Sequence, residues 1–194
     1  YKRQIWIGTR NGLAKYNQRT DNFTGYISEG TSFGRPACNE IISLMESSQG
    51  VLWVGTWYGG LARFNKETGQ FRYYFGEGDT LTIPRIRTLF QRTANSFYLG
   101  SDDGLYTFNT TTGECLPTDD EQNKESIYAC YQDREGGIWI GTYFSGVSYL
   151  SPKHKDIEWY YPNGTENSLS GNVISQFCED PDGNIWIATE DGGL

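Results

Sequence analysis

The chain has 194 residues and carries 24 acidic against 16 basic side chains, a formal net charge of −8. This charge disfavours a nucleic-acid backbone or an anionic membrane as a partner, and the apolar runs are too short to span a bilayer. Aromatic residues make up 15% of the chain, which also holds 24 glycines. Such a composition favours short strands and tight turns over helices.

A five-residue motif, first seen as Ile5-Trp6-Ile7-Gly8-Thr9, occurs five times along the chain. The aromatic positions of its copies are Trp6, Trp53, Tyr98, Trp139 and Trp186, at spacings of 47, 45, 41 and 47 residues. A repeat of this length that contains several short strands predicts β-propeller blades.

Each repeat contains predicted strands that we name A to D after the clearest copy, in which they cover 41–45, 51–56, 61–65 and 71–75. The chain opens in a B strand around Trp6, and Leu194 stands where a C strand would start. The other predicted strands are, in chain order, 13–16, 23–27, 86–90, 97–101, 105–108, the short 115–116 broken by Pro117, 127–131, 138–142, 147–150, 157–161, 173–177 and 185–189.

The predicted fold is therefore all-β, a propeller of four-stranded antiparallel blades with about four blades present over residues 1–194. Because the chain starts in strand B of one repeat and stops before strand C of another, its ends do not coincide with blade boundaries. We therefore expect a fragment of a longer chain and an arc of a larger propeller of the seven-bladed type. Two copies that associate to complete a ring remain an alternative.

Two positions of the motif have a predicted physical role. The Trp is large enough to fill the wedge between adjacent sheets, and the Gly two residues later lets strand B bend or a neighbouring backbone approach closely. A second glycine precedes each C strand, where a turn favours a positive φ. Ala188 and Tyr98 depart from the Gly and Trp patterns and are interpreted as ordinary variation between repeats.

The repeat resembles the two-component regulator propeller repeat. Its first half is seen in Asp133-Arg134-Glu135-Gly136-Gly137-Ile138-Trp139-Ile140-Gly141-Thr142 and its second half in Thr56-Trp57-Tyr58-Gly59-Gly60-Leu61-Ala62-Arg63-Phe64-Asn65. The resemblance covers essentially the whole chain. It implies the extracytoplasmic sensor region of a hybrid two-component histidine kinase of the kind found in gut Bacteroides, which detects oligosaccharides and regulates polysaccharide-utilisation genes.

Residues that carry catalytic or metal chemistry are sparse. The one histidine, His154, lies between lysines, which is typical of a solvated loop. The carboxylate pairs Asp102-Asp103 and Asp119-Asp120 are neighbours in sequence, so their side chains point apart rather than converge. The segment 180–184 is interpreted as a hairpin turn rather than a calcium loop. We therefore predict no catalytic residue, no metal site and no cofactor.

The four cysteines include no C-x-x-C pair, which argues against a structural zinc site. Cys130 and Cys178 fall in slots that the other repeats fill with apolar residues, so both are expected to be buried. Disulfides are left open.

Ligand contacts are expected where the repeats differ, because a constant scaffold with variable loops concentrates binding in those loops. The connections between strands B and C differ in every repeat. The candidate ligand-binding residues are Arg10, Asn11, Trp57, Tyr58, Arg85, Arg87, Asp102, Asp103, Tyr143 and Phe144. The aromatic pairs offer stacking surfaces for sugar rings, and the polar residues offer hydrogen bonds to hydroxyl groups. The alternative is that these aromatics cap the blades or pack against a second propeller.

The expected function is that of a periplasmic, non-catalytic sensor propeller. Its expected partners are an oligosaccharide, a second propeller and downstream domains of the same chain, and a second copy in a homodimer of the full-length protein, with no nucleic acid and no direct membrane contact of this segment. Two alternatives stay open: a glycan-active propeller enzyme such as a lyase or hydrolase, and a scaffold for dimerisation.

Overall fold

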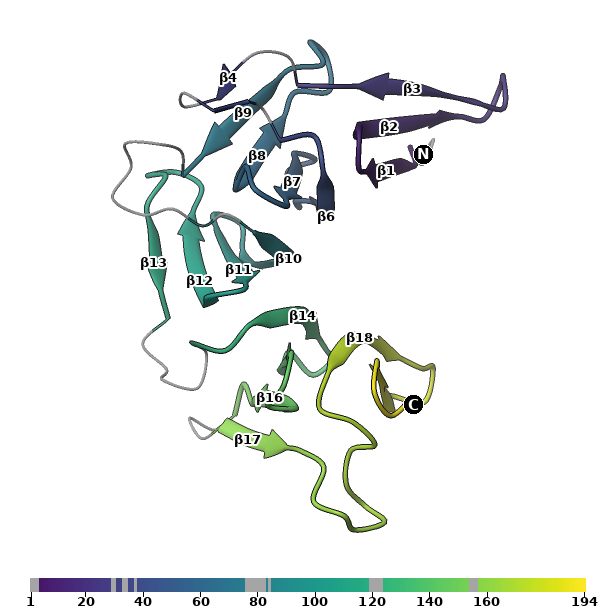
Figure 1. Ribbon diagram of the computed structural model, residues 1–194, viewed down its shortest axis with the longest axis vertical. Helices are drawn as coiled ribbons and strands as arrows, with labels where there is room; N and C mark the ends of the chain where they lie inside the picture. Colours follow the sequence, from purple (N-terminus) through teal and green to yellow (C-terminus); the bar gives the residue numbers. More distant parts are fainter. Residues whose placement is uncertain are drawn as a thin grey trace. The chain divides into compact units, whose positions relative to one another are not determined.

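The computed structural model describes residues 4–28, 31–32, 35–36, 38–75, 83, 85–118, 124–153 and 157–194. Within these ranges the chain is all-β and contains no α-helix (Figure 1), so no described helix could span a membrane. The chain divides into two compact units, Tyr1–Phe97 with Phe108–Cys115, and Tyr98–Thr107 with Leu116–Leu194.

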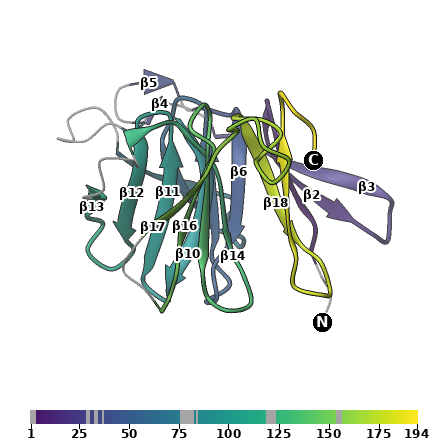
Figure 2. The ribbon, with the colours of Figure 1, turned by 90° about the horizontal axis from the view of Figure 1, so that it is seen from below.

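Besides a small hairpin, the first unit holds two antiparallel sheets, one of three strands and one of four. One has the order β1 (Trp6–Thr9), β2 (Gly12–Asn17), β3 (Asn22–Tyr26), and its β2–β3 hairpin is prominent in Figure 2. The other has the order β6 (Ile41–Glu46), β7 (Leu52–Thr56), β8 (Leu61–Phe64), β9 (Phe71–Tyr74). A small hairpin of β4 (Thr31–Ser32) and β5 (Arg35–Pro36), which the sequence did not predict, lies between them in sequence.

A further sheet has strands that are divided between the two units. Its order is β10 (Ile86–Thr93), β11 (Ser96–Ser101), β12 (Gly104–Asn109), β13 (Cys115–Pro117). β10 runs further than predicted, and Pro117 belongs to β13 instead of breaking it. The outermost strand tolerates a proline because one side of its backbone needs no ladder hydrogen bond.

The second unit holds a four-stranded antiparallel sheet with the order β14 (Ile127–Gln132), β15 (Ile138–Thr142), β16 (Val147–Leu150), β17 (Ile157–Tyr160). It is followed by the pair β18 (Ile174–Glu179) and β19 (Ile185–Thr189), and a bridge joins Thr189 to Gly193. The predicted order of A, B, C and D strands is confirmed in the three four-stranded sheets, whereas β1–β3 correspond to strands B, C and D and β18–β19 to strands A and B.

The motif tryptophans fill the space between consecutive sheets, as predicted. Trp53 on β7 is only 3% exposed, and its ring centroid lies 5.1 Å from that of Phe97 and 5.6 Å from that of Phe108, which belong to the next sheet. Trp6 contacts Phe64 of the following sheet in the same way, at 5.3 Å. Burying such a side chain is worth about 3–5 kcal/mol, judged from the truncation of buried aromatics.

Trp186 is the exception, since 52% of it is exposed. It lies on the β18–β19 pair, and no described sheet follows to cover this face. Cys178 pairs with Trp186 across the two strands and so shares the uncovered face. The prediction that Cys178 is buried is therefore wrong: its side chain is exposed.

The glycine of the motif allows the next sheet to approach. A Cβ built on Gly141 would lie 2.8 Å from the Cβ of Ile174, the first residue of β18, and one on Gly8 would lie 2.6 Å from Cγ2 of Ile41, the first residue of β6. At the corresponding position of β19, Ala188 is accommodated because no described sheet packs there. The glycines that precede the C strands also adopt positive φ, as predicted: they are Gly12, Gly60, Gly104, Gly146 and Gly193.

Consecutive sheets are joined by equivalent hydrogen bonds. The Gly12 amide donates to the Asn39 carbonyl at 2.7 Å in the first unit, and the Gly146 amide donates to the Asn172 carbonyl at 3.3 Å in the second. Asn39 and Asn172 both stand two residues before an A strand. This repeated bond fixes where the connections between strands B and C lie relative to the strand that follows.

Candidate functional site

The connections between strands B and C are closed by one hydroxyl each. The side chain of Thr56 donates to the Gly60 carbonyl at 2.9 Å and accepts from the Gly59 amide at 2.8 Å. Equivalent pairs of bonds occur at Thr9, Ser101, Thr142 and Thr189. The motif needs a hydroxyl here because only a group that both donates and accepts can satisfy both backbone atoms.

The first residue of each connection is held by its main chain. The Trp57 amide donates to the Glu40 carbonyl at 2.9 Å and the Tyr143 amide to the Ser126 carbonyl at 3.0 Å. Glu40 and Ser126 each stand immediately before an A strand. The position directly before strand A is therefore the anchor of the connection, which sequence reasoning missed.

The side chain of that first residue contacts the anchor position of the following repeat. In the first unit, Arg10 Nε lies 3.7 Å from Glu40 Oε1, and the Arg85 guanidinium lies 4.2 Å from the centroid of the Trp57 ring. In the second unit, the Ser126 hydroxyl donates to Asp102 Oδ1 at 3.4 Å. An ion pair, a cation–π contact and a hydrogen bond thus occupy one structural position in successive repeats.

Four of the predicted residues form one cluster in the first unit. The Arg85 guanidinium also lies 5.6 Å from the Tyr58 ring, and that of Arg87 lies 5.3 Å from the Trp57 ring. Trp57 is half-buried, whereas Tyr58 is 61% exposed. The arginines therefore support the indole by cation–π attraction, and the phenol of Tyr58 is presented to solvent beside it.

The second unit presents a similar aromatic group. Tyr143 stacks on Tyr128, with ring centroids 4.9 Å apart and planes inclined by 19°, and Phe144 packs edge-on against Tyr143 at 4.1 Å. Phe144 is 65% exposed. Tyr128 was not among the predicted residues, although its place two residues after the anchor Ser126 corresponds to that of Arg87 after Arg85.

The predicted residues thus separate into two sets. We call the connections between strands B and C, together with the residues at the start of the A strands, the rim. Residues at the first position of a connection, and the two arginines, make contacts within the rim; they are Arg10, Trp57, Asp102, Tyr143, Arg85 and Arg87. Those at the second position are exposed; they are Asn11, Tyr58, Asp103 and Phe144. The last connection differs, because Asp191 turns back to accept from the Asn172 and Val173 amides, each at 3.1 Å. These two amides hold the pKa of the Asp191 carboxyl below its usual value.

The segment 180–184 is a hairpin turn, as predicted. Asp180 accepts from the side chain and the amide of Asn184 at 2.9 Å, from the Trp186 indole at 3.0 Å and from the Asp182 amide at 3.0 Å. These bonds, led by those from Asn184, lower the pKa of the Asp180 carboxyl to about 2. Its oxygens are therefore occupied by the turn.

Other candidates for chemistry add little. Within the described ranges, His, Cys, Asp and Glu side chains do not gather in threes as a metal would need. His154 and the pair Asp119-Asp120 lie outside the described residues. The cysteines are free thiols, and burial raises the pKa of both Cys115 and Cys130 to about 12.

The fold and the loop geometry define a class: an all-β protein of propeller blades with a constant loop closure and a variable rim. Residues 36–58, 121–144 and 168–191 match the two-component regulator propeller family. The chain therefore carries two-component regulator propeller repeats. No curated protein matches the sequence.

Solved structures share this fold. The chain is 22% identical to the extracellular domain of the one component system BT4673 from B. thetaiotaomicron, with a TM-score of 0.79 over 97% of this chain and 25% of that one. It is 22% identical to the extracellular domain of the hybrid two component system BT3049 from the same organism, with a TM-score of 0.63 over 98% of this chain and 31% of that one.

Virginiamycin B lyase from Staphylococcus aureus is a third similar structure, at 14% identity and a TM-score of 0.68 over 98% of this chain and 64% of the lyase. At these identities the likeness concerns the fold. The chain spans about a quarter of the length of the extracellular domain of BT4673.

Proposed function

We propose that the chain is a ligand-sensing part of the extracytoplasmic region of a hybrid two-component histidine kinase, and that its ligand is an oligosaccharide. The regulator propeller repeats and the similarity to the extracellular domain of the hybrid two component system BT3049 support the sensor role. In this proposal the region lies in the periplasm. The 194 residues form an arc of a larger propeller of the seven-bladed type.

The observation that carries the ligand proposal is the exposed aromatic side chain at the second position of two connections. Tyr58 and Phe144 are 61% and 65% exposed, although each follows an aromatic residue that is held within the rim. An exposed aromatic on a rigid loop offers a flat apolar face, and the C–H face of a pyranose ring complements it. Asn11 and Asp103, at the equivalent positions of other repeats, supply polar groups for sugar hydroxyls.

Signalling follows from this arrangement by population shift. A ligand that binds one placement of the propeller relative to its downstream domains more tightly than another shifts the equilibrium between the two placements and so biases the kinase. The size of the shift equals the difference between the binding free energies of the ligand for the two placements. The proposed partners of the complete protein are a second propeller, the downstream domains and a second copy in a homodimer.

Oligosaccharide binding to the 194-residue chain tests the proposal. A panel of neutral plant and host oligosaccharides is titrated and followed by calorimetry and by tyrosine and tryptophan fluorescence. We expect saturable binding without turnover, weakened at least about tenfold, or 1.4 kcal/mol, by Tyr58→Ala or by Phe144→Ala.

Phe23→Ala is the matched control, because Phe23 is a 56% exposed aromatic on β3, outside the connections. Release of shorter sugars from the oligosaccharide would contradict the sensor proposal and support the glycan-active enzyme. Self-association with no binding of any oligosaccharide would instead favour the dimerisation scaffold.

A further inference from the structure

Arg63 and Arg72 stand directly opposite each other on β8 and β9. Both side chains are exposed, and neither forms a hydrogen bond or an ion pair with another described residue. Like charges directly opposite on neighbouring strands destabilise a sheet. The pair is the more unexpected because acidic residues outnumber basic ones by 24 to 16 in this chain.

The equivalent positions of other sheets carry different chemistry. In the β1–β3 sheet the corresponding pair is Lys15 opposite Thr24, and in the β14–β17 sheet it is Tyr149 opposite Glu158. Neither pair places two cations together. The arginine pair is therefore not required by the repeat, and its function has to be sought in what it binds.

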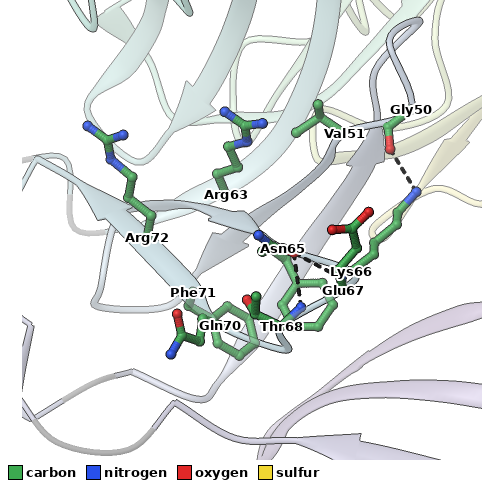
Figure 3. A pocket seen from close by; sticks show the side chains of 11 residues that line it. Gly50, Val51, Arg63, Asn65, Lys66, Glu67, Thr68, Gln70, Phe71 and Arg72 are labelled. Atoms are coloured by element: carbon green, nitrogen blue, oxygen red, sulfur yellow. Dashed lines mark hydrogen bonds between the residues drawn. The ribbon is translucent and has the colours of Figure 1, made fainter.

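The two arginines line a hollow of about 640 Å³ at the end of β8 that is distant from its connection to β7. Figure 3 shows Arg63 and Arg72 extending in the same direction, away from the turn that carries Lys66 and Glu67. The ammonium group of Lys66 is already paired, since its Nζ lies 2.5 Å from Glu46 Oε1 and donates to the Gly50 carbonyl at 2.8 Å. Among the described residues that line the hollow, Glu67 is the one carboxylate.

The remaining lining groups add little beside the two arginines. Val51 offers apolar surface near the arginines, whereas Figure 3 shows Thr68, Gln70 and Phe71 on the opposite side of the two strands. The recognition therefore rests on the two guanidinium groups. The side-chain oxygen Oδ1 of Asn65 is occupied, because it accepts from the Glu67 and Thr68 amides at 2.9 and 3.1 Å. Arg72 is oriented by Tyr74, whose ring centroid lies 5.6 Å from its guanidinium carbon.

We propose that Arg63 and Arg72 bind a carboxylate, carried by a small organic acid or by an acidic sugar. Guanidinium groups match the planar geometry of a carboxylate and bind it through paired N–H···O bonds. A bound carboxylate also relieves the repulsion between the two arginines. This site lies at the other end of β8 from Tyr58 and is independent of the proposed oligosaccharide contacts.

The test measures binding of D-glucuronate, succinate and D-glucose to the 194-residue chain by calorimetry, at constant ionic strength adjusted with sodium chloride. We expect at least one carboxylate to bind at least about tenfold more tightly than glucose, and Arg63→Gln and Arg72→Gln each to remove most of that difference. Tighter binding of glucuronate identifies the acidic sugar as the source, and tighter binding of succinate identifies the organic acid.

Lys15→Gln, at the equivalent position of the β1–β3 sheet, is the matched control and should leave binding unchanged. Without ligand, Arg63→Gln should raise the melting temperature by about 1–3 °C, because it removes the like-charge pair. Carboxylate binding that survives both arginine substitutions, or no binding of either acid, overturns the proposal. Neither result bears on the neutral oligosaccharides tested with Tyr58→Ala.

Discussion

The Thr56 hydroxyl and the Gly60 carbonyl are joined by a buried hydrogen bond of 2.9 Å, and the same bond closes the corresponding connection in every repeat. The Thr56 oxygen also accepts from the Gly59 amide. One side chain therefore holds the loop that presents Trp57 and Tyr58. This relationship makes the loop a rigid support.

Replacement of Thr56 by valine should destabilise the fold by about 1–3 kcal/mol, because it leaves the Gly59 amide without its partner. The Gly60 carbonyl loses the hydroxyl but keeps its bond from the Thr56 amide at 3.1 Å. Thr9→Val is the control: Thr9 is exposed, so water replaces its hydroxyl and a smaller loss is expected. Urea unfolding of both variants measures the difference. Equal losses would show that burial of the loop closure does not matter.

Gly141→Ala should destabilise the chain by about 1–3 kcal/mol, the usual range for overpacking, because the new Cβ would meet Ile174 of the next sheet at 2.8 Å. The reverse change on β19, Ala188→Gly, meets no such neighbour. It should cost only about 0.5–1 kcal/mol, from backbone entropy. Thermal and urea unfolding compare the two, and a Gly141→Ala variant as stable as the wild type would contradict the close approach.

Asp180 should make stability depend on pH at the acidic end. Its folded pKa is lowered to about 2 and its unfolded value is near 4, so its stabilising effect is complete above pH 4. The effect is lost as the pH falls from about 4 through 2. Asp180→Asn should reduce the dependence of the melting temperature on pH in that window. Asp182→Asn, whose side chain makes none of these bonds, serves as the control. An unchanged slope in Asp180→Asn would argue against the turn contacts.

Cys178 should react with iodoacetamide faster than Cys115 and Cys130 in the folded chain at pH 8. The thiolate is the reactive form, and burial raises the pKa of Cys115 and of Cys130 to about 12. The Cys178 side chain is exposed, and the fourth cysteine, Cys38, is half-buried. Peptide mapping after timed labelling identifies the modified residues. Cys178→Ser should remove the fast phase, and faster labelling of Cys130 would contradict the burial assignment.

The strand order and the role of the tryptophans could be predicted because they depend on a repeated local pattern. Each copy of the motif repeats the same alternation of apolar and small residues, so one interpretation applies to all sheets. The exposure of Trp186 and Cys178 could not be predicted in this way. It depends on whether another sheet covers that face, which the local pattern does not encode.

The rim was only partly predictable for a similar reason. Variation between repeats identified the connections, and the structure brings Trp57, Tyr58, Arg85 and Arg87 together. The role of Glu40 as an anchor was missed because it depends on a main-chain bond to Trp57 that any residue could make. The opposed arginines Arg63 and Arg72 were missed because their meeting depends on the register of β8 and β9.

The separation of the two rim positions has a consequence for how such proteins diversify. The first residue of a connection is tied to its neighbours, so changing it perturbs the scaffold. The side chain of the second residue, as at Tyr58 or Phe144, is mostly exposed, so changing it perturbs the scaffold less. Single substitutions at the loop tips can therefore change the exposed surface one repeat at a time, while folding is left intact.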